Sequence, residues 1–211
     1  MPDLTLWGLF VLASLLLLLT PGPAVLYIVA RSIQQGRIAG LVSVIGIHLG
    51  TIVHITAAAL GLSALLVSSA LAFAVVKYLG AAYLIWMGLR TLMAKDTIVH
   101  AEALKLEAKS LRRAFRDGFV VNLFNPKTAI FFLSFLPQFV DPARGVVHLQ
   151  VLILGLTFMG LGMLTDGMFA LLAGAAGDFL RRSKPFQRIL RWFSGASFIG
   201  LGVTAAVASR K

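Results

Sequence analysis

Cysteine is absent from this 211-residue chain, and charged residues are scarce. Without cysteine there is no disulfide framework, thiol redox chemistry, iron–sulfur cluster or thiolate metal site. Charged residues make up 13% of the chain and hydrophobic residues 59%, whereas a soluble domain carries about 25% and about 45–50%. The mean hydropathy is +0.92. These values exclude soluble globular, disordered and fibrous proteins and predict an all-α integral membrane protein.

Six apolar stretches are long enough to cross a bilayer, because a helical crossing needs about 20 residues. We place the spans at 4–28, 40–67, 71–92, 117–139, 147–174 and 187–208. The second and third spans are divided at Ser68-Ser69, since one crossing cannot absorb the apolar run from 41 to 89 even when tilted. Turns are expected at 31–37 and 141–145, and Pro185 suits the first turn of the last helix. No basic residue precedes the first span, so we expect a retained helix and not a signal peptide.

Positive charges are concentrated in three of the connecting segments. Fourteen Lys and Arg residues follow spans one, three and five, and three lie on the opposite side. The positive-inside rule places the basic loops in the cytoplasm and both termini outside. The formal charge of +11 is then explained by topology and attraction to anionic lipid. The sequence has no basic groove with interleaved aromatic residues, so no nucleic-acid partner is expected.

The two halves of the chain resemble each other in an inverted sense. Span one carries Leu19-Thr20-Pro21-Gly22-Pro23 midway along its length, and span four carries Phe124-Asn125-Pro126-Lys127 at a comparable place. Each half has an odd number of spans, so the second half inserts upside down relative to the first. We predict a single transporter domain made of a 3+3 inverted repeat, with halves 1–93 and 117–211 joined by a cytoplasmic loop at 94–116.

Both of these runs place proline inside an apolar span. Proline removes a backbone hydrogen bond, and in lipid the freed groups must find partners, so such breaks persist where they are buried or line a wet cavity. A half-helix that begins after a break directs its N–H groups and positive dipole inward, which suits a carboxylate. Two matching breaks therefore favour a central site over two structural kinks. The candidate substrate-binding residues are Thr20, Pro21, Gly22, Pro23, Asn122, Asn125, Pro126 and Lys127.

Two ionisable residues lie deep within the predicted spans. Lys127 follows the second break, where its ammonium group can bind a substrate carboxylate, pair with an acid or snorkel to the headgroups. Asp166 is the only carboxylate that we place well inside a span. Burial disfavours its charged form, which makes it a candidate proton carrier; a static pair with Lys127 and contact with a substrate amine are the alternatives. No metal site is expected, because His48 and His54 lie on different faces of span two with no carboxylate near them in that span.

Further motifs accompany the two breaks in both halves. They are Gly36-x-x-x-Gly40 with Gly46, Tyr83-Leu84-Ile85-Trp86-Met87-Gly88, Gly118-Phe119, Phe131-Phe132-Leu133 and Pro137-Gln138-Phe139. Together with the breaks, these motifs resemble the lysine-exporter (LysE/RhtB) family of bacterial amino-acid efflux proteins. The resemblance covers both halves of the chain.

This resemblance implies export of amino acids or close derivatives from the cytoplasm across the bacterial inner membrane, driven by the proton gradient. It carries Asp166 over as the candidate proton carrier, and the central site as Pro21, Gly22, Asn125, Pro126 and Lys127. With one deep lysine and one deep aspartate, we expect neutral substrates such as homoserine, threonine or leucine.

Neither an enzymatic activity nor a cofactor is expected. A thiol–disulfide reductant needs cysteine, and a hydrolase needs a Ser/His/Asp or His–metal arrangement whose spacing is not found. Efflux of a cation or another small solute, or a passive channel, stay open as alternatives, although oxygen-binding cations favour several intramembrane carboxylates. The expected partners are the amino-acid substrate, protons and the lipid bilayer. Small-residue faces such as Gly46-x-x-x-Gly50 also permit a homodimer.

Overall fold

The computed structural model describes residues 4–68, 70–93, 110–182 and 184–207, and every regular element in these ranges is helical. The α-helices are α1 (Leu4–Leu19), α2 (Pro23–Ser68), α3 (Ala70–Met93), α4 (Leu111–Leu123), α5 (Pro126–Ile130), α6 (Val147–Arg182) and α7 (Lys184–Val207). Between α5 and α6 lie the π-helix η1 (Phe131–Phe135) and the 3-10 helices η2 (Leu136–Phe139) and η3 (Pro142–Arg144). The prediction of an all-helical fold is therefore confirmed.

Both predicted helix breaks are present. The first apolar stretch consists of two half-helices, because α1 ends at Leu19 and α2 begins at Pro23. In the fourth stretch α4 ends at Leu123, and the following segment Pro126–Phe139 is bent by 45° from it. Beyond this second break the backbone continues as η1 and η2, a change of helix type that hydropathy does not reveal. Short π-helical segments are frequent at functional sites.

Two connections differ from the sequence-based expectation. The turn expected at 31–37 is confined to Gly36, whose φ of 84° lies in the left-handed region that favours glycine. Arg31 therefore lies inside helix α2, where it is fully buried. Residues 111–116, which hydropathy assigns to the loop at 94–116, form the first turns of α4. Polar residues there continue the helix beyond its apolar part; positions 94–109 lie outside the described residues.

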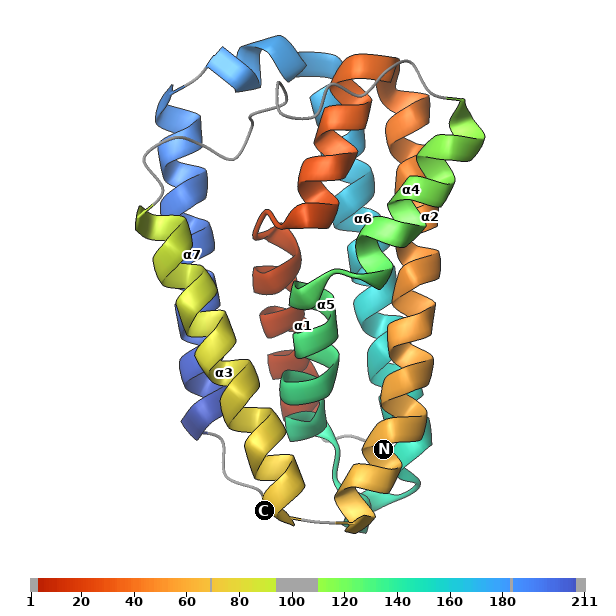
Figure 1. Ribbon diagram of the computed structural model, residues 1–211, viewed down its shortest axis with the longest axis vertical. Coiled ribbons are helices and arrows are strands. Elements are labelled where there is room, and N and C mark those ends of the chain that lie inside the picture. The colour runs from red at the N-terminus through yellow and green to blue at the C-terminus, as the bar shows by residue number, and fades with distance from the viewer. Residues whose placement is uncertain (1–3, 69, 94–109, 183, 208–211) are drawn as a thin grey trace.

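The helices run along the long axis of the molecule (Figure 1). The half-helix α1 and the segment that begins with α5 lie in the centre, with α3 packed on α7 at one side and α2 packed on α4 and α6 at the other. The turn at Gly36, the start of α4 and the junction of α6 with α7 lie at one end of the bundle. The start of α1 and the end of α7 lie at the opposite end (Figure 1).

Length and composition identify membrane-crossing helices in the described residues. Pro23–Gly61 and Val147–Ala175 are each long and apolar enough to cross a bilayer, and the bent pair formed by Leu111–Leu123 and Pro126–Phe139 counts as a third crossing. The fold is thus that of a helical integral membrane protein. The total of six spans and the inverted repeat stay predictions.

Glycine lets α2 and α4 approach to backbone contact. A Cβ at Gly46 would collide with the carbonyl oxygen of Phe115, and a Cβ at Gly118 would lie 2.6 Å from the carbonyl oxygen of Ser43. Small residues at helix interfaces permit this approach in membranes. It holds Asn122 of α4 against α2 and so positions one wall of the site described below.

We expect Gly46→Ala to destabilise the protein by about 1–3 kcal/mol, because the added methyl group overlaps a main-chain carbonyl that cannot rotate away. Gly61→Ala on the same helix is the matched control, since nothing lies within 4 Å of its Cβ position. Thermal unfolding of both variants in detergent measures the difference. Equal unfolding temperatures for the two variants would contradict the packing argument.

Candidate functional site

A small cavity lies where the two helix breaks approach each other. Its polar lining residues are His48, Thr51, Asn122, Asn125, Lys127, Thr128 and Asp166. The cavity offers about 30 Å³ to the centres of water molecules, and one buried water needs about 10–15 Å³ of such space. The cavity in this conformation therefore has space for about two water molecules, and an amino acid enters only if the surrounding helices move.

The side chain of Lys127 reaches from the second break to the first. It is buried, with 6% of its surface exposed, and its Nζ donates a hydrogen bond to the carbonyl oxygen of Thr20. This oxygen lies at the carboxyl end of α1, where the helix dipole favours a cation. Lys127 does not snorkel to the headgroups. A Cβ at Gly22 would lie 2.9 Å from its Cδ, so the glycine of the first break makes room for the lysine of the second.

Two asparagines hold the second break in place. The Oδ1 of Asn125 accepts a hydrogen bond from the backbone N–H of Lys127 at 3.1 Å, and its Nδ2 donates to the Oδ1 of Asn122 at 3.2 Å. The Nδ2 of Asn122 donates to the carbonyl oxygen of Ile47 at 2.8 Å and to the hydroxyl of Thr51 at 3.0 Å. The backbone groups freed by the break are thus held by side chains, and α4 and α5 are tied to α2.

Asp166 of α6 lies beside His48 of α2 in the lining of the cavity. The Oδ2 of Asp166 lies 3.2 Å from the Nε2 of His48, and the two side chains are 6% and 5% exposed. Lys127 lines the same cavity. A pair with Lys127 was one alternative predicted for Asp166, and a pair with His48 was not predicted, because helical periodicity does not encode the partner of a residue on another helix. The available signal was Gly162, one turn before Asp166: a Cβ there would lie 2.6 Å from the Cε1 of His48.

The eight candidate substrate-binding residues do not all reach the cavity. Four of them line it: Gly22, Asn122, Asn125 and Lys127. Thr20 contributes its carbonyl oxygen, whereas its hydroxyl donates back to the carbonyl oxygen of Leu16. The three prolines shape the backbone and do not belong to the lining: Pro21, Pro23 and Pro126.

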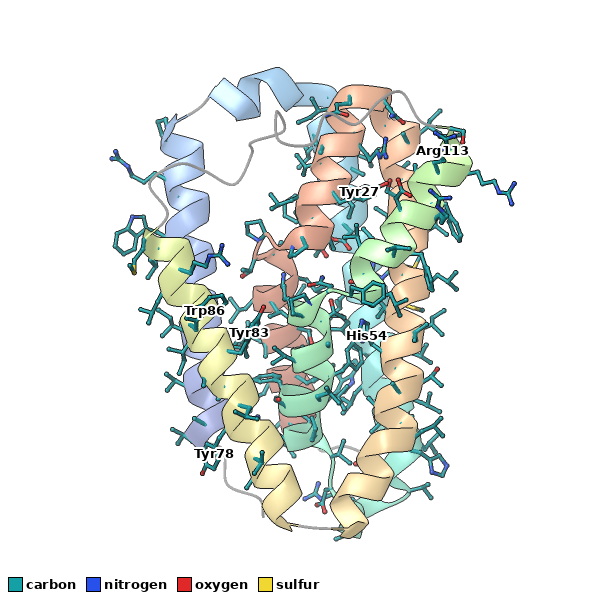
Figure 2. All side chains as sticks on the ribbon, viewed as in Figure 1. Tyr27, His54, Tyr78, Tyr83, Trp86 and Arg113 are labelled. Atoms are coloured by element: carbon teal, nitrogen blue, oxygen red, sulfur yellow. The ribbon has the colours of Figure 1, made fainter. Side chains whose placement is uncertain are left out.

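The second histidine of span two has a different environment. The Nε2 of His54 donates to the carbonyl oxygen of Asn122 at 2.9 Å, and its ring stacks on Phe132 with centroids 6.3 Å apart. It lies on α2 beside the central helices (Figure 2). Among the described residues, no group of three His, Cys, Asp or Glu side chains could hold a metal ion.

A buried polar cluster ties α2 to α4 between the cavity and the turn at Gly36. The Nε of Arg31 donates to the hydroxyl of Tyr27 at 3.0 Å, and its Nη2 lies 3.4 Å from the Oδ2 of Asp117. The Tyr27 hydroxyl donates in turn to the carbonyl oxygen of Ala114 at 3.2 Å. Tyr27 lies nearer than His54 to the end of the bundle that carries the turn at Gly36 (Figure 2). Sequence reasoning counted Arg31 as a loop cation and missed this role.

Aromatic side chains fill the bundle on the other side of the breaks. The cluster consists of Phe10 of α1, Phe131, Phe132 and Phe135 of η1, Phe139 of η2 and Phe158 of α6. Ring centroids are 5.9 Å apart between Phe10 and Phe131, and 4.6 Å between Phe131 and Phe158. The cavity therefore lies between a polar cluster and an aromatic cluster, each of which joins one half of span one to one half of span four.

Comparison with known proteins agrees with this architecture. The model of the family described as LysE type translocator matches residues 15–209. An uncharacterized membrane protein of Vibrio cholerae is 31% identical over 98% of each chain. The homoserine/homoserine lactone efflux protein of Salmonella typhimurium is 33% identical over 96% of each chain, and the leucine efflux protein of an Enterobacter species is 26% identical over 93% of each chain. No solved structure matches the chain.

Proposed function

Because the chain belongs to the LysE type translocator family, we propose that it exports amino acids or close derivatives from the cytoplasm across the inner membrane. One observation carries this proposal: the cavity at the two breaks has a cation, Lys127, and an anion, Asp166, in its lining. Ionisable residues inside a membrane protein are costly and mark substrate pathways. Opposite charges in one cavity complement the carboxylate and the ammonium group of an amino acid.

The preferred substrates are neutral amino acids such as homoserine, threonine or leucine. The described lining contains one lysine and one aspartate. A second cationic group on the substrate would therefore have no carboxylate to pair with. Relatives named as homoserine/homoserine lactone and leucine efflux proteins support this preference.

Export is coupled to proton entry, and Asp166 is the proposed proton carrier. Its carboxyl group is buried, lines the cavity and lies 3.2 Å from the imidazole of His48, so a proton held there would lie next to the substrate site. Efflux of a cation or another small solute, and a passive channel, are the competing functions.

The proposed architecture is a single domain of six spans in which halves 1–93 and 117–211 form an inverted repeat. The half-helices of span one and those of span four run in opposite directions along the bundle (Figure 1), as an inverted repeat requires. The basic segments lie at the turn near Gly36, after α3 and after α6. We place the end of the bundle that carries them in the cytoplasm. Both termini then lie outside.

Cells preloaded with labelled homoserine, threonine, leucine and lysine provide the test. We expect cells that produce the protein to release one or two of the neutral amino acids several-fold faster than control cells, and an uncoupler to abolish the difference. Absence of efflux with the protein inserted would overturn amino-acid export. Efflux that is downhill and insensitive to the uncoupler would favour the passive channel.

A further inference from the structure

We propose that the imidazolium of His48 and the ammonium group of the substrate bind in turn to the one carboxylate of Asp166, so that each displaces the other. This inference rests on the proposed function and refines its coupling step: the proton is held on His48, and Asp166 takes part as the carboxylate that binds either cation. It assigns a role to His48, which is separated from the first break by the turn at Gly36 in α2 and lies on a different helix from the second, and it requires a free ammonium group on the substrate.

The environment of His48 differs from that of a structural histidine. The side chain is 5% exposed, and neither Nδ1 nor Nε2 has a hydrogen-bond partner among the described residues. Nε2 lies at ion-pair distance from the Oδ2 of Asp166, 3.2 Å, without the alignment of a hydrogen bond. A buried histidine with a fixed structural role normally has its second nitrogen held by a carbonyl or carboxylate. Buried polar atoms without partners need an explanation, and a ligand that enters this cavity provides one.

The position of His48 depends on a glycine of the facing helix. A Cβ at Gly162 would lie 2.6 Å from the Cε1 of the ring, so the space that receives the imidazole exists because that position has no side chain. His48 and Asp166 both line the cavity together with Lys127. A substrate in the cavity therefore meets all three groups.

The charges in the cavity make the two cations exclude each other. From the elements packed around the pair, the other polar groups in the lining are Thr51 of α2, Asn122 of α4, and Asn125, Lys127 and Thr128 at the start of α5. Lys127 and Asp166 alone balance each other, and a zwitterionic substrate leaves that balance unchanged. A protonated His48 next to a substrate ammonium group would place two cations against one carboxylate in a largely buried site, where like charges repel strongly.

The exchange step involves one proton and one substrate. When the substrate ammonium group reaches Asp166 from the cytoplasmic side, an N–H bond of the imidazolium breaks, the electron pair stays on nitrogen and the proton passes to cytoplasmic water. After the substrate leaves on the outer side, His48 takes a proton from outside and pairs again with Asp166. One substrate leaves for each proton that enters.

Proteoliposomes with and without an imposed pH gradient test the inference, with L-homoserine and L-leucine as probes. We expect His48→Gln to lower gradient-driven accumulation by about tenfold or more, within the range of coupling between two ligands. Exchange of labelled for unlabelled substrate without a gradient needs no proton, so it should fall clearly less than accumulation, and the ratio of accumulation to exchange should drop several-fold. His148→Gln is the matched control, since His148 is exposed at the start of α6 and should leave both rates unchanged.

A binding measurement adds a readout that a structural role would not move. In weakly buffered detergent solution, wild-type protein should release a proton when either probe is added and none with N-acetyl-L-leucine, which has no ammonium group. His48→Gln should release none. Gly162→Ala displaces the ring without removing it and should show the same defect, whereas Gly160→Ala, with nothing within 4 Å of its Cβ position, should not.

The outcomes separate the two proposals. If wild-type protein shows no gradient-driven transport of either probe, the proposed function fails and the inference fails with it. If wild type is coupled and His48→Gln is equally coupled, only the inference is overturned. Loss of exchange together with coupling in both His48→Gln and Gly162→Ala would also overturn it, because that pattern marks a structural role.

Discussion

Lys127→Gln is expected to abolish export. The ammonium group of Lys127 donates a hydrogen bond to the carbonyl oxygen of Thr20. Among the described residues of the cavity lining, the only other side chain that can be a cation is that of His48, when it is protonated. Truncating one partner of a buried charge interaction costs about 2–5 kcal/mol, which corresponds to a loss of substrate affinity of at least about 30-fold. Glutamine keeps hydrogen-bonding capacity, so the loss reports the charge and not merely an unfilled space.

The measurement is efflux of labelled leucine and homoserine from preloaded cells, combined with immunodetection of the inserted protein. Arg113→Gln removes the same charge from an exposed position on α4, at the outer surface of the bundle (Figure 2), and should leave efflux unchanged. A second readout identifies the substrate group that Lys127 recognises. Wild type should prefer leucine over leucine amide, and Lys127→Gln should lose that preference. Wild-type efflux by Lys127→Gln would remove Lys127 from the site.

Asp166→Asn is expected to abolish proton-driven export while the protein stays inserted. Asparagine is nearly the same size as aspartate but holds no negative charge, so it can neither carry a proton nor pair with a substrate ammonium group. Because both roles depend on the one carboxylate, substrate exchange without a gradient should also fall, by at least about 30-fold if a buried charge interaction is lost. This pattern differs from His48→Gln, for which exchange is expected to persist.

Asp141→Asn provides the control for the loss of a carboxylate. Asp141 caps the short helix η3 through the backbone N–H of Ala143 and pairs with Arg144 at 3.2 Å, away from the cavity. Its replacement should leave transport near the wild-type rate. Full uphill export by Asp166→Asn in the same proteoliposomes would exclude Asp166 as the proton carrier.

Much of this molecule follows from local chemistry. Apolar stretches of about 20 residues become helices because in lipid each backbone N–H and C=O must be bonded within the segment. The breaks at 20–22 and at Asn125 follow equally directly, since proline cannot donate the hydrogen bond that a helix needs. The division between α2 and α3, which end and begin at Ser68 and Ala70, was also predictable from the length limit on one crossing.

The contents of the site depend on contacts between helices. Periodicity places His48 on a face of α2 and Asp166 on a face of α6, but it carries no information on which faces meet. Their 3.2 Å approach arises because Gly162 leaves space for the ring. In the same way Arg31 is a basic residue near a turn in the sequence, and it becomes fully buried because Tyr27 and Asp117 converge on it from two helices.

The sequence by itself therefore determined the membrane environment, the helical class and the positions of the two breaks, since each depends on backbone hydrogen bonding within one segment. Only the tertiary structure decided where the ammonium group of Lys127 lies, which partner faces Asp166 and how small the cavity is. Those features depend on residues far apart in the sequence, 107 positions for Lys127 and Thr20, that meet when glycine-lined helices pack, and packing is a property of the whole bundle.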